Sequence, residues 1–321
     1  MILRHFRFIL LPLLLIGAAR ADPVVLRVGY FPNITHAQGI IGCEGTREKK
    51  GWFEQRLGPD VTLQWYAFNA GPSAMEAIFA GSIDLTYTGP NPALNAYIRS
   101  RGEEIRVLAG AAEGGAALVV QGDGSIAKPA DFRGRRVATP QLGNTQDVAA
   151  RAWLQRQGFR ITMTGGDVLV LPTENPDQLG LFQRHEIDAA WTVEPWVSRL
   201  EIEAGGHVFL EQNDAVTTVL VASVKFLRTH PGLAERFRAA HTELTAWINA
   251  NPSEAQALVR TGLAAETKRE MSAALVASAW HRLRFTDRTS PEQFASLVKD
   301  AQSVGFLRNA IPLDRLFSGT P

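Results

Sequence analysis

Short apolar runs alternate with amphipathic segments from residue 26 to residue 223, and this alternation limits the fold more than any other feature of the sequence. Short apolar runs between turn signals predict buried strands, and the intervening segments carry helical patterns and caps. The predicted strands are 26–30, 61–66, 83–88, 106–110, 117–121, 136–139, 168–171, 187–192 and 216–223. Strands that alternate with helices form a mostly parallel sheet covered by helices, so the sequence predicts an α/β protein.

The order of the strands predicts two α/β units. The pattern is complete at Gly110, restarts at Ala117 and returns at Val216. In addition, 321 residues exceed what one hydrophobic core usually holds. Two units, the second inserted into the first, explain this order. The chain after His230 is predicted to be almost wholly helical.

Local signals predict where several helices begin. Ser73 with Glu76 forms a possible capping box, and Asn91 is a possible cap with Pro92 at the first helical position. A later helix opens at Asn144 or Thr145. Each of these helix starts follows a predicted strand.

The first residues predict a secretory signal peptide. Arg4 and Arg7 precede the apolar run 8–16, and Ala21 ends a tripeptide of the cleavage type. The run is shorter than the roughly 20 residues that span a bilayer, so we expect removal of residues 1–21 and a periplasmic protein. A short N-terminal anchor is the alternative.

Charge and cysteine content exclude several classes of partner. The 33 basic and 32 acidic residues leave no field that would attract a polyanion, so no nucleic-acid partner is expected. Cys43 is the only cysteine; it cannot form an internal disulfide, and its helical setting favours a buried packing role over a reactive thiol. No cofactor and no metal site are expected.

Three turns that follow strands are the candidate binding elements: 29–36, 88–91 and 140–147. Each leads from the carboxyl end of a strand to the start of a helix, and ligands of open α/β sheets bind at that edge. Unpaired N–H groups at helix starts would hold an oxyanion without any arginine. Taken singly, each turn is more often an ordinary helix cap than a ligand contact, and the joint interpretation rests on three such turns at equivalent strand ends. The hydroxyl and amide side chains there are Asn33, Thr35, Ser73, Thr88, Asn144, Thr145 and Gln146.

Three further residues have two interpretations each. Trp191, at the end of a strand, belongs either to the core or to the wall of the cleft. Glu194 would repel an anion, so it either caps the next helix or contacts the cationic group of a zwitterion. His36 either donates to an anion or makes a structural hydrogen bond.

Signatures of catalysis are absent from the sequence. There is no Gly-x-Ser-x-Gly elbow, no His-Glu-x-x-His, no Walker A loop and no Gly-x-Gly-x-x-Gly, and the seven histidines are scattered singly. The residues therefore favour binding over catalysis.

The ordered turn motifs resemble the sulfonate, nitrate and taurine family of periplasmic substrate-binding proteins. The resemblance spans about residues 26–225, and the C-terminal helices follow more loosely. The matching segments are Gly29-Tyr30-Phe31-Pro32-Asn33-Ile34-Thr35-His36-Ala37, Gly51-Trp52-Phe53, Gly71-Pro72-Ser73, Ala80-Gly81-Ser82-Ile83-Asp84, Thr88-Gly89-Pro90-Asn91-Pro92, Gly143-Asn144-Thr145-Gln146-Asp147 and 191–196.

This resemblance implies a periplasmic-binding-protein fold of type II, with two lobes, a hinge and a cleft between them. It implies lobe 1 at 22–115 plus 218–321 and lobe 2 at 116–217, with crossovers near 114–117 and 216–219. The ligand residues that it implies are Asn33, Ile34, Thr35, His36, Gly71, Pro72, Ser73, Thr88, Gly89, Pro90, Asn91, Gln141, Gly143, Asn144, Thr145, Gln146, Asp147, Trp191 and Glu194.

By the same resemblance, the chain would be a monomer that binds a small anionic or zwitterionic ligand and delivers it to an ABC permease and ATPase complex. An aliphatic sulfonate or taurine is the expected ligand. The turns contain no arginine to clamp a sulfonate, so nitrate, bicarbonate or another small anion, and service to a sensor, stay as alternatives. A pyrimidine-precursor synthase on the same scaffold would need a cysteine-rich iron segment and a cofactor lysine, and a chain with only Cys43 lacks that segment.

Overall fold

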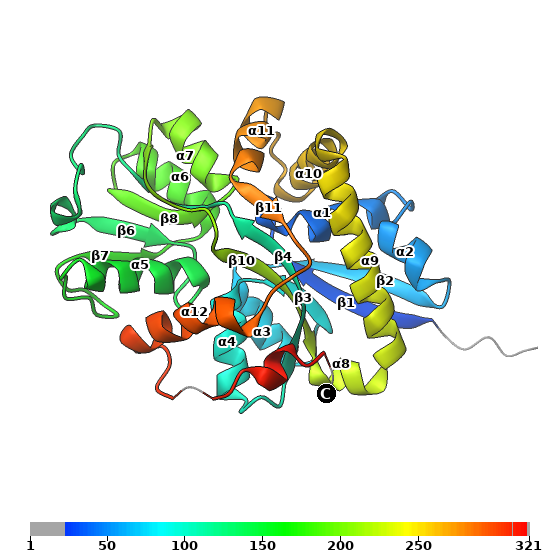
Figure 1. The fold of residues 1–321 in the computed structure, drawn as a ribbon. Coiled ribbons are helices and arrows are strands. Elements are labelled where there is room, and N and C mark those ends of the chain that lie inside the picture. Colours follow the sequence, from blue (N-terminus) through cyan, green and yellow to red (C-terminus); the bar gives the residue numbers. More distant parts are fainter. Residues whose placement is uncertain (1–22, 310, 320–321) are drawn as a thin grey trace, which may run out of the picture.

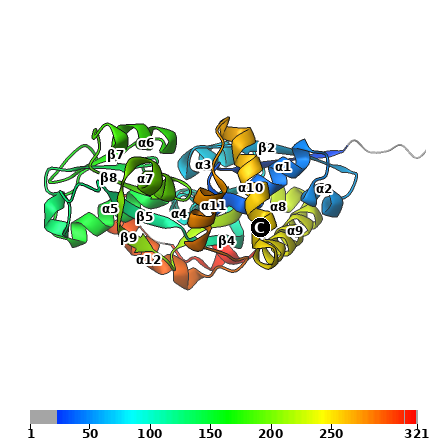
Figure 2. The ribbon, with the colours of Figure 1, turned by 90° about the horizontal axis from the view of Figure 1, so that it is seen from above.

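The computed structural model describes residues 23–309 and 311–319, so the predicted signal peptide lies outside the described residues. Two sheets, each covered by helices, lie side by side in an elongated molecule (Figures 1 and 2). The predicted α/β class is confirmed. Within the described ranges, no helix is long and apolar enough to span a bilayer.

The first sheet has six strands in the order β11-β4-β10-β3-β1-β2. Strand β1 is parallel to β2 and β3, whereas β10 is antiparallel to β3 and β4. Its strands are β1 (Val24–Tyr30), β2 (Val61–Ala67), β3 (Leu85–Thr88), β4 (Ile105–Gly114), β10 (Val216–Ser223) and β11 (Leu283–Phe285). The helical elements that lie before β5 or after β9 in the chain are η1 (Ile34–His36), α1 (Ala37–Arg47), α2 (Trp52–Leu57), α3 (Gly71–Phe79), α4 (Pro90–Arg99), α8 (Val224–Thr229), α9 (Pro231–Ala250), α10 (Pro252–Thr267), α11 (Ala273–His281), α12 (Pro291–Ser303) and η3 (Asp314–Phe317).

The second sheet has five strands in the order β7-β6-β8-β5-β9. Strand β6 is parallel to β7 and β8, and β5 is antiparallel to β8 and β9. Its strands are β5 (Ala116–Val120), β6 (Arg136–Thr139), β7 (Leu169–Pro172), β8 (Ala189–Val193) and β9 (His207–Gln212), and its helices are η2 (Pro129–Phe132), α5 (Thr145–Arg156), α6 (Asn175–Gln183) and α7 (Trp196–Ala204).

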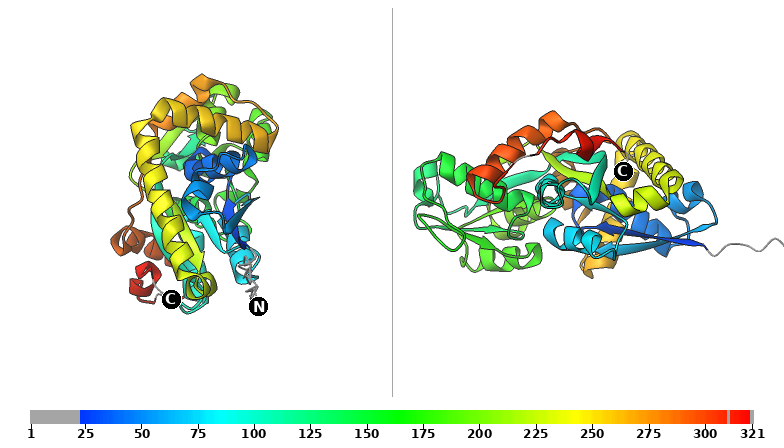
Figure 3. Two further views of the ribbon diagram at one scale, coloured as in Figure 1. Left: turned by 90° about the vertical axis from the view of Figure 1, so that its right-hand side faces the viewer. Right: turned by 90° about the horizontal axis from the view of Figure 1, so that it is seen from below.

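Apolar side chains pack on both faces of each sheet. On one face of the first sheet, Phe53 of α2 and Phe237 of α9 are fully buried and stack with their ring centroids 4.5 Å apart. Burying one such side chain contributes about 1.5 to 3 kcal/mol. The long helix α9 therefore holds α2 against the sheet, and Figure 3 shows it running along one side of the molecule.

The chain passes between the sheets twice, once at Gly114 and Gly115 and once at residues 213–215. Gly114 has φ of 73°, and a Cβ there would lie 2.3 Å from the carbonyl oxygen of Arg282, so only glycine fits this crossover. The second crossover precedes the position predicted for it, 216–219, because all of β10 belongs to the first sheet. We retain the division into two lobes at these crossovers as a proposal.

Two predicted helix starts are wrong. Helix α3 begins at Gly71 after Ala70, so Ser73 is inside it rather than at its cap, and α4 begins at Pro90 after Gly89, so Asn91 is not its cap. Proline suits the first turn because an N–H there has no intrahelical partner. The Asn144 cap is confirmed: its side chain accepts a hydrogen bond from the Asp147 N–H.

Two strands were not predicted. Strand β9 pairs with β5 at the edge of the second sheet, and the three-residue β11 pairs with β4 at the edge of the first. Both are edge strands, whose partly exposed faces weaken the apolar signal. Apart from β11, the described elements after His230 are helical, as the prediction of an almost wholly helical segment expects.

Candidate functional site

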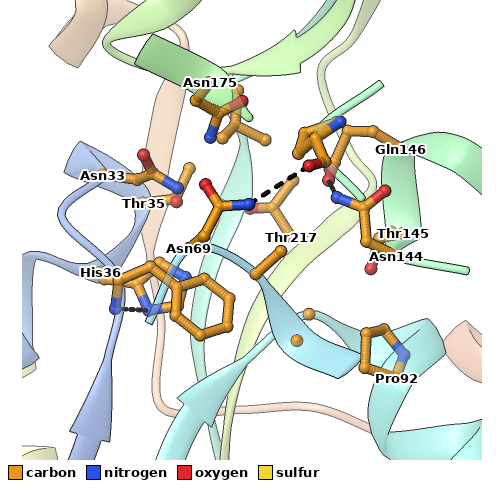
Figure 4. Close-up of a pocket in the computed structure, with 16 residues that line it drawn as sticks. Asn33, Thr35, His36, Asn69, Pro92, Asn144, Thr145, Gln146, Asn175 and Thr217 are labelled. Carbon is orange, nitrogen blue, oxygen red and sulfur yellow. Dashed lines mark hydrogen bonds between the residues drawn. The ribbon is translucent and has the colours of Figure 1, made fainter. Parts of the chain in front are cut away.

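A small pocket lies between the two sheets, where the starts of several helices meet (Figure 4). The empty space between its lining atoms is about 340 Å³, a value that includes solvent at its open mouth. The residues that line it are Phe31, Asn33, Thr35, His36, Asn69, Ala70, Gly71, Gly89, Pro92, Pro140, Asn144, Thr145, Gln146, Asn175, Val193 and Thr217.

Helix starts from both sheets supply most of this lining. Ala70 and Gly89 are the N-caps of α3 and α4, Asn144 is the N-cap of α5, and Asn175 is the first residue of α6. Asn33 directly precedes η1, which continues into α1. The first turn of a helix has unpaired N–H groups and a partial positive charge, so these elements together favour a bound anion.

The two lobes approach each other closely at the pocket. A Cβ placed on Gly89 would lie 2.4 Å from Oγ1 of Thr145, the first residue of α5. The N–H of Asn91 donates to the same oxygen at 3.4 Å. Hydrogen bonds from Asn69 Nδ2 to the Pro140 carbonyl (3.2 Å) and between Ser73 and Gln141 (3.0 Å) also join the two sides. Direct contacts therefore join the two sides of the described pocket.

The lining carries no Asp, Glu, Lys or Arg among the described residues. Its one histidine, His36, is buried, and burial lowers the pKa of this imidazole to about 3. The Phe31 N–H donates to His36 Nδ1 at 3.3 Å, so the proton of the neutral ring is on Nε2. His36 is thus an uncharged donor at neutral pH, and backbone and side-chain dipoles provide the positive potential of the site.

The structure brings eight of the predicted site residues together in the pocket lining. They are Asn33, Thr35, His36, Gly71, Gly89, Asn144, Thr145 and Gln146. Eleven do not line it: Ile34, Pro72, Ser73, Thr88, Pro90, Asn91, Gln141, Gly143, Asp147, Trp191 and Glu194. Each of the three candidate turns thus contributes lining residues, and ligand binding by any of these residues stays a prediction.

Thr88 and Asn91 are buried close behind the lining. The Thr88 hydroxyl oxygen would lie 2.8 Å from a Cβ on Gly71. Neither this hydroxyl nor the side-chain amide of Asn91 has a hydrogen-bond partner within the described residues. Buried polar groups in such a state are unusual, which makes both positions candidates for contact with a ligand or with water.

Asp147 and Trp191 have structural partners instead. The buried carboxylate of Asp147 accepts hydrogen bonds from Thr139 Oγ1 and the Gly143 N–H and forms an ion pair with Arg151. Trp191 is in the core of the second sheet, where its indole N–H donates to Gln212 Oε1. The carboxylate of Asp147 and the indole ring of Trp191 therefore stabilise the fold.

Glu194 is fully buried and is not among the residues that line the pocket. Its carboxylate accepts hydrogen bonds from the N–H and Oγ of Ser198 and forms an ion pair with Arg282 at 3.0 Å. Burial raises the pKa of this carboxyl group, and Ser198 and Arg282 partly oppose the rise. No acidic group of this turn is thus available to repel an anion.

Eight lining residues were not predicted: Phe31, Asn69, Ala70, Pro92, Pro140, Asn175, Val193 and Thr217. Asn69 and Asn175 follow β2 and β7, so the rule that selected the other turns could have found them. Thr217 is at a register shift of β10, next to Thr218 in an otherwise mostly apolar strand, and no strand-end turn marks it.

Comparisons with known proteins agree with this architecture. Residues 19–263 match the model of the NMT1-like family. The chain is 28% identical over 267 residues to a putative aliphatic sulfonates-binding protein of Escherichia coli K12, covering 81% of this chain and 73% of that protein. It is 26% identical over 198 residues to the taurine-binding periplasmic protein of the same strain, covering 60% and 59%.

Among solved structures, the alkanesulfonate-binding protein SsuA from Xanthomonas axonopodis pv. citri, bound to MOPS, has a TM-score of 0.71. At 18% identity the match covers 88% of this chain and 93% of that one, and it shows the shared fold. The predicted resemblance to the sulfonate, nitrate and taurine group of binding proteins is confirmed. The chain belongs to the NMT1-like family and has the fold of a periplasmic binding protein.

Proposed function

We propose that this protein is the solute-binding component of an ABC importer and binds a small oxyanion, such as an aliphatic sulfonate, by closure of two lobes. The observation that carries the proposal is the meeting of helix starts from both sheets around a lining without charged side chains. The names of its relatives support the same class of ligand.

Capture of the ligand would follow from the division of the helix starts between the two lobes. The starts of α3 and α4 come from one lobe and those of α5 and α6 from the other. An oxyanion would receive N–H groups from both sides only when the lobes are close together, so it would bind the closed form more tightly and shift a hinge equilibrium toward it. The closed form would then dock on a permease and ATPase complex in the periplasm.

We further propose that the protein acts without catalysis. The described lining offers hydroxyl and amide groups and one neutral histidine, and none of its members is a thiol or carboxylate. Cys43 is buried in α1, where its sulfur accepts a hydrogen bond from the Tyr30 hydroxyl, and burial raises the pKa of its thiol. These conditions suit a structural cysteine rather than a nucleophile.

The test compares an anion with an uncharged molecule of the same shape. Methanesulfonate and methanesulfonamide are titrated into the protein, and binding is measured by calorimetry and by the shift in Tm. A ligand at 100 times its Kd stabilises the native state by about 2.7 kcal/mol, so methanesulfonate should raise Tm and methanesulfonamide should not. Equal effects of both, or none from any sulfonate, nitrate or bicarbonate, would contradict the proposal.

A further inference from the structure

Hydrogen bonds outside the pocket determine which atom each amide of the lining presents to a ligand. Asn33 Oδ1 accepts from the indole N–H of Trp196 at 2.9 Å. Because an indole nitrogen only donates, the oxygen of this amide must face Trp196 and its NH₂ group must face elsewhere. In Figure 4 the nitrogen of Asn33 points toward the middle of the pocket. Asn33 is therefore a donor to the ligand.

Gln146 is oriented in the same way through a chain of two bonds. The Asp147 N–H donates to Asn144 Oδ1 at 2.8 Å, which places the NH₂ group of Asn144 on its other side. That group donates to Gln146 Oε1 at 3.1 Å. The carbonyl oxygen of Gln146 is thus occupied, and its NH₂ group is the part left for a ligand. With His36 Nε2, the lining presents at least three uncharged donors.

Asn69 has the opposite orientation. Its NH₂ group donates to the carbonyl oxygen of Pro140 at 3.2 Å, and a carbonyl oxygen only accepts. Asn69 Oδ1 has no hydrogen-bond partner within the described residues, and Figure 4 shows it turned toward the side of the pocket where Asn33 and Asn175 lie. An acceptor in this place would repel every part of a ligand that carries only oxygen lone pairs.

From this pattern we infer that the ligand is an oxyanion that also carries an uncharged hydrogen-bond donor, an O–H group, which binds to Asn69 Oδ1. The inference rests on the proposed function and narrows its substrate class. A hydroxylated alkanesulfonate has this chemistry, and so does an oxyanion that retains one proton, such as bicarbonate.

A charged ammonium donor fits less well than a hydroxyl. The nearby acidic groups that could balance it are already paired: Glu194 with Arg282, and Asp147 with Arg151. An ammonium group buried against neutral amides alone would lose hydration that these dipoles replace only in part. Taurine should therefore bind more weakly than its hydroxyl counterpart, 2-hydroxyethanesulfonate.

Two matched pairs of ligands test the inference. Ethanesulfonate and 2-hydroxyethanesulfonate differ by one hydroxyl group, and nitrate and bicarbonate are planar anions of similar size that differ by one O–H. In calorimetric titrations, the O–H-bearing member of the pair that resembles the natural ligand should bind more tightly than its partner. The difference should be between about twofold and about tenfold, as one net hydrogen bond between uncharged groups predicts. Which pair shows the preference distinguishes a hydroxysulfonate from a protonated oxyanion.

Two variants separate recognition from a structural effect. Asn69→Leu keeps the shape of the side chain but removes Oδ1 and the bond to Pro140; it should weaken all ligands and reduce the preference within the pair to about onefold. Gln183→Ala removes an exposed amide that donates to the Glu203 carbonyl, and it should leave affinities and preference unchanged. Tm without ligand confirms that both variants are folded.

The outcomes distinguish this inference from the proposed function. If sulfonates or the smaller anions bind but neither pair shows a preference, or if the preference survives in Asn69→Leu, the inference is overturned and the proposed function stands. If taurine binds more tightly than 2-hydroxyethanesulfonate, the donor is charged and the inference is likewise wrong. If none of these anions binds, both fail.

Discussion

The indole N–H of Trp196, at the start of α7, donates to Oδ1 of Asn33 at 2.9 Å, which joins residues 163 positions apart in the chain. Both side chains are buried, and Asn33 lines the pocket whereas Trp196 does not. A residue of the second lobe thus holds a pocket-lining amide of the first in one orientation.

Substitution of this tryptophan tests the orientation. Trp196→Phe keeps most of the ring but removes the N–H donor, so the Asn33 amide can turn and offer its oxygen to the anion. We expect the affinity for a sulfonate to fall by about 1 kcal/mol, or about fivefold, in calorimetric titrations. Trp153→Phe, in the core of the second sheet, is the control. An unchanged affinity in Trp196→Phe would contradict the role of this bond.

A substitution at Gly89 tests whether ligand binding requires the two lobes to approach each other at this point. Its φ of −68° suits alanine, but the added Cβ would lie 2.4 Å from Thr145 Oγ1 across the pocket. Gly89→Ala should therefore hinder closure and weaken ligand binding by about 1 to 3 kcal/mol, the usual cost of inserting a methyl group into a packed contact.

The matched control for this variant is Gly232→Ala, because a Cβ at Gly232 meets no atom within 4 Å. Affinity is measured by calorimetry, and the radius of gyration with ligand by small-angle X-ray scattering. A Gly89→Ala protein that binds and compacts like the unmodified one would show that the lobes do not need this approach.

Two buried histidines predict acid sensitivity. Burial lowers the pKa of His36 to about 3 and that of His241 to about 4, whereas the unfolded chain titrates near 6.5. The unfolded state therefore binds more protons below pH 6.5, and stability that is complete above this value is lost as pH falls toward the folded pKa values. Each histidine should lower the free energy of unfolding by about 2 kcal/mol between pH 7 and pH 5.

Urea denaturation of a His241→Gln variant at both pH values checks this expectation. Its loss of stability between pH 7 and pH 5 should be about 2 kcal/mol smaller than that of the unmodified protein. The comparison uses the difference between two pH values, so a constant effect of the substitution cancels. His207→Gln, at an exposed position of β9, should change nothing. An equal acid sensitivity in all three proteins would refute the assignment.

Arg282 is predicted to be costly to remove. It lies between the carboxylates of Glu194, Glu201 and Glu211, and the Glu194 side chain is 0% exposed. Arg282→Met leaves this buried carboxylate without its cation, so we expect a loss of about 3 kcal/mol in the free energy of unfolding.

An exposed arginine provides the comparison. Arg238 pairs with Glu235 on the surface of α9, and Arg238→Ala should cost less than about 1 kcal/mol. Both values come from urea denaturation at pH 7. Similar small losses in the two variants would mean that Ser198 alone can hold the Glu194 carboxylate.

The turns at strand ends show how far sequence reasoning reached into the site. Asn144 was identified because a cap residue after a strand is a local signal, and Gly89 because it belongs to the turn that follows a predicted strand. Thr217 carried no such signal, and Ser73 followed a plausible capping pattern that the structure does not use. Local patterns locate an element, but several starting residues are often compatible with the same pattern.

The sequence by itself determined the α/β class, nine of the eleven strands of the described residues, and the strand-end turns that meet at the pocket, because apolar periodicity and helix punctuation act within a few residues. Only the tertiary structure decided that Glu194 pairs with Arg282, that Trp191 belongs to the core, and that Trp196 and Pro140 orient Asn33 and Asn69. These contacts join residues far apart in the chain. The orientation of each amide depends on whether its partner donates or accepts a hydrogen bond, and that partner is defined only when the two lobes pack together.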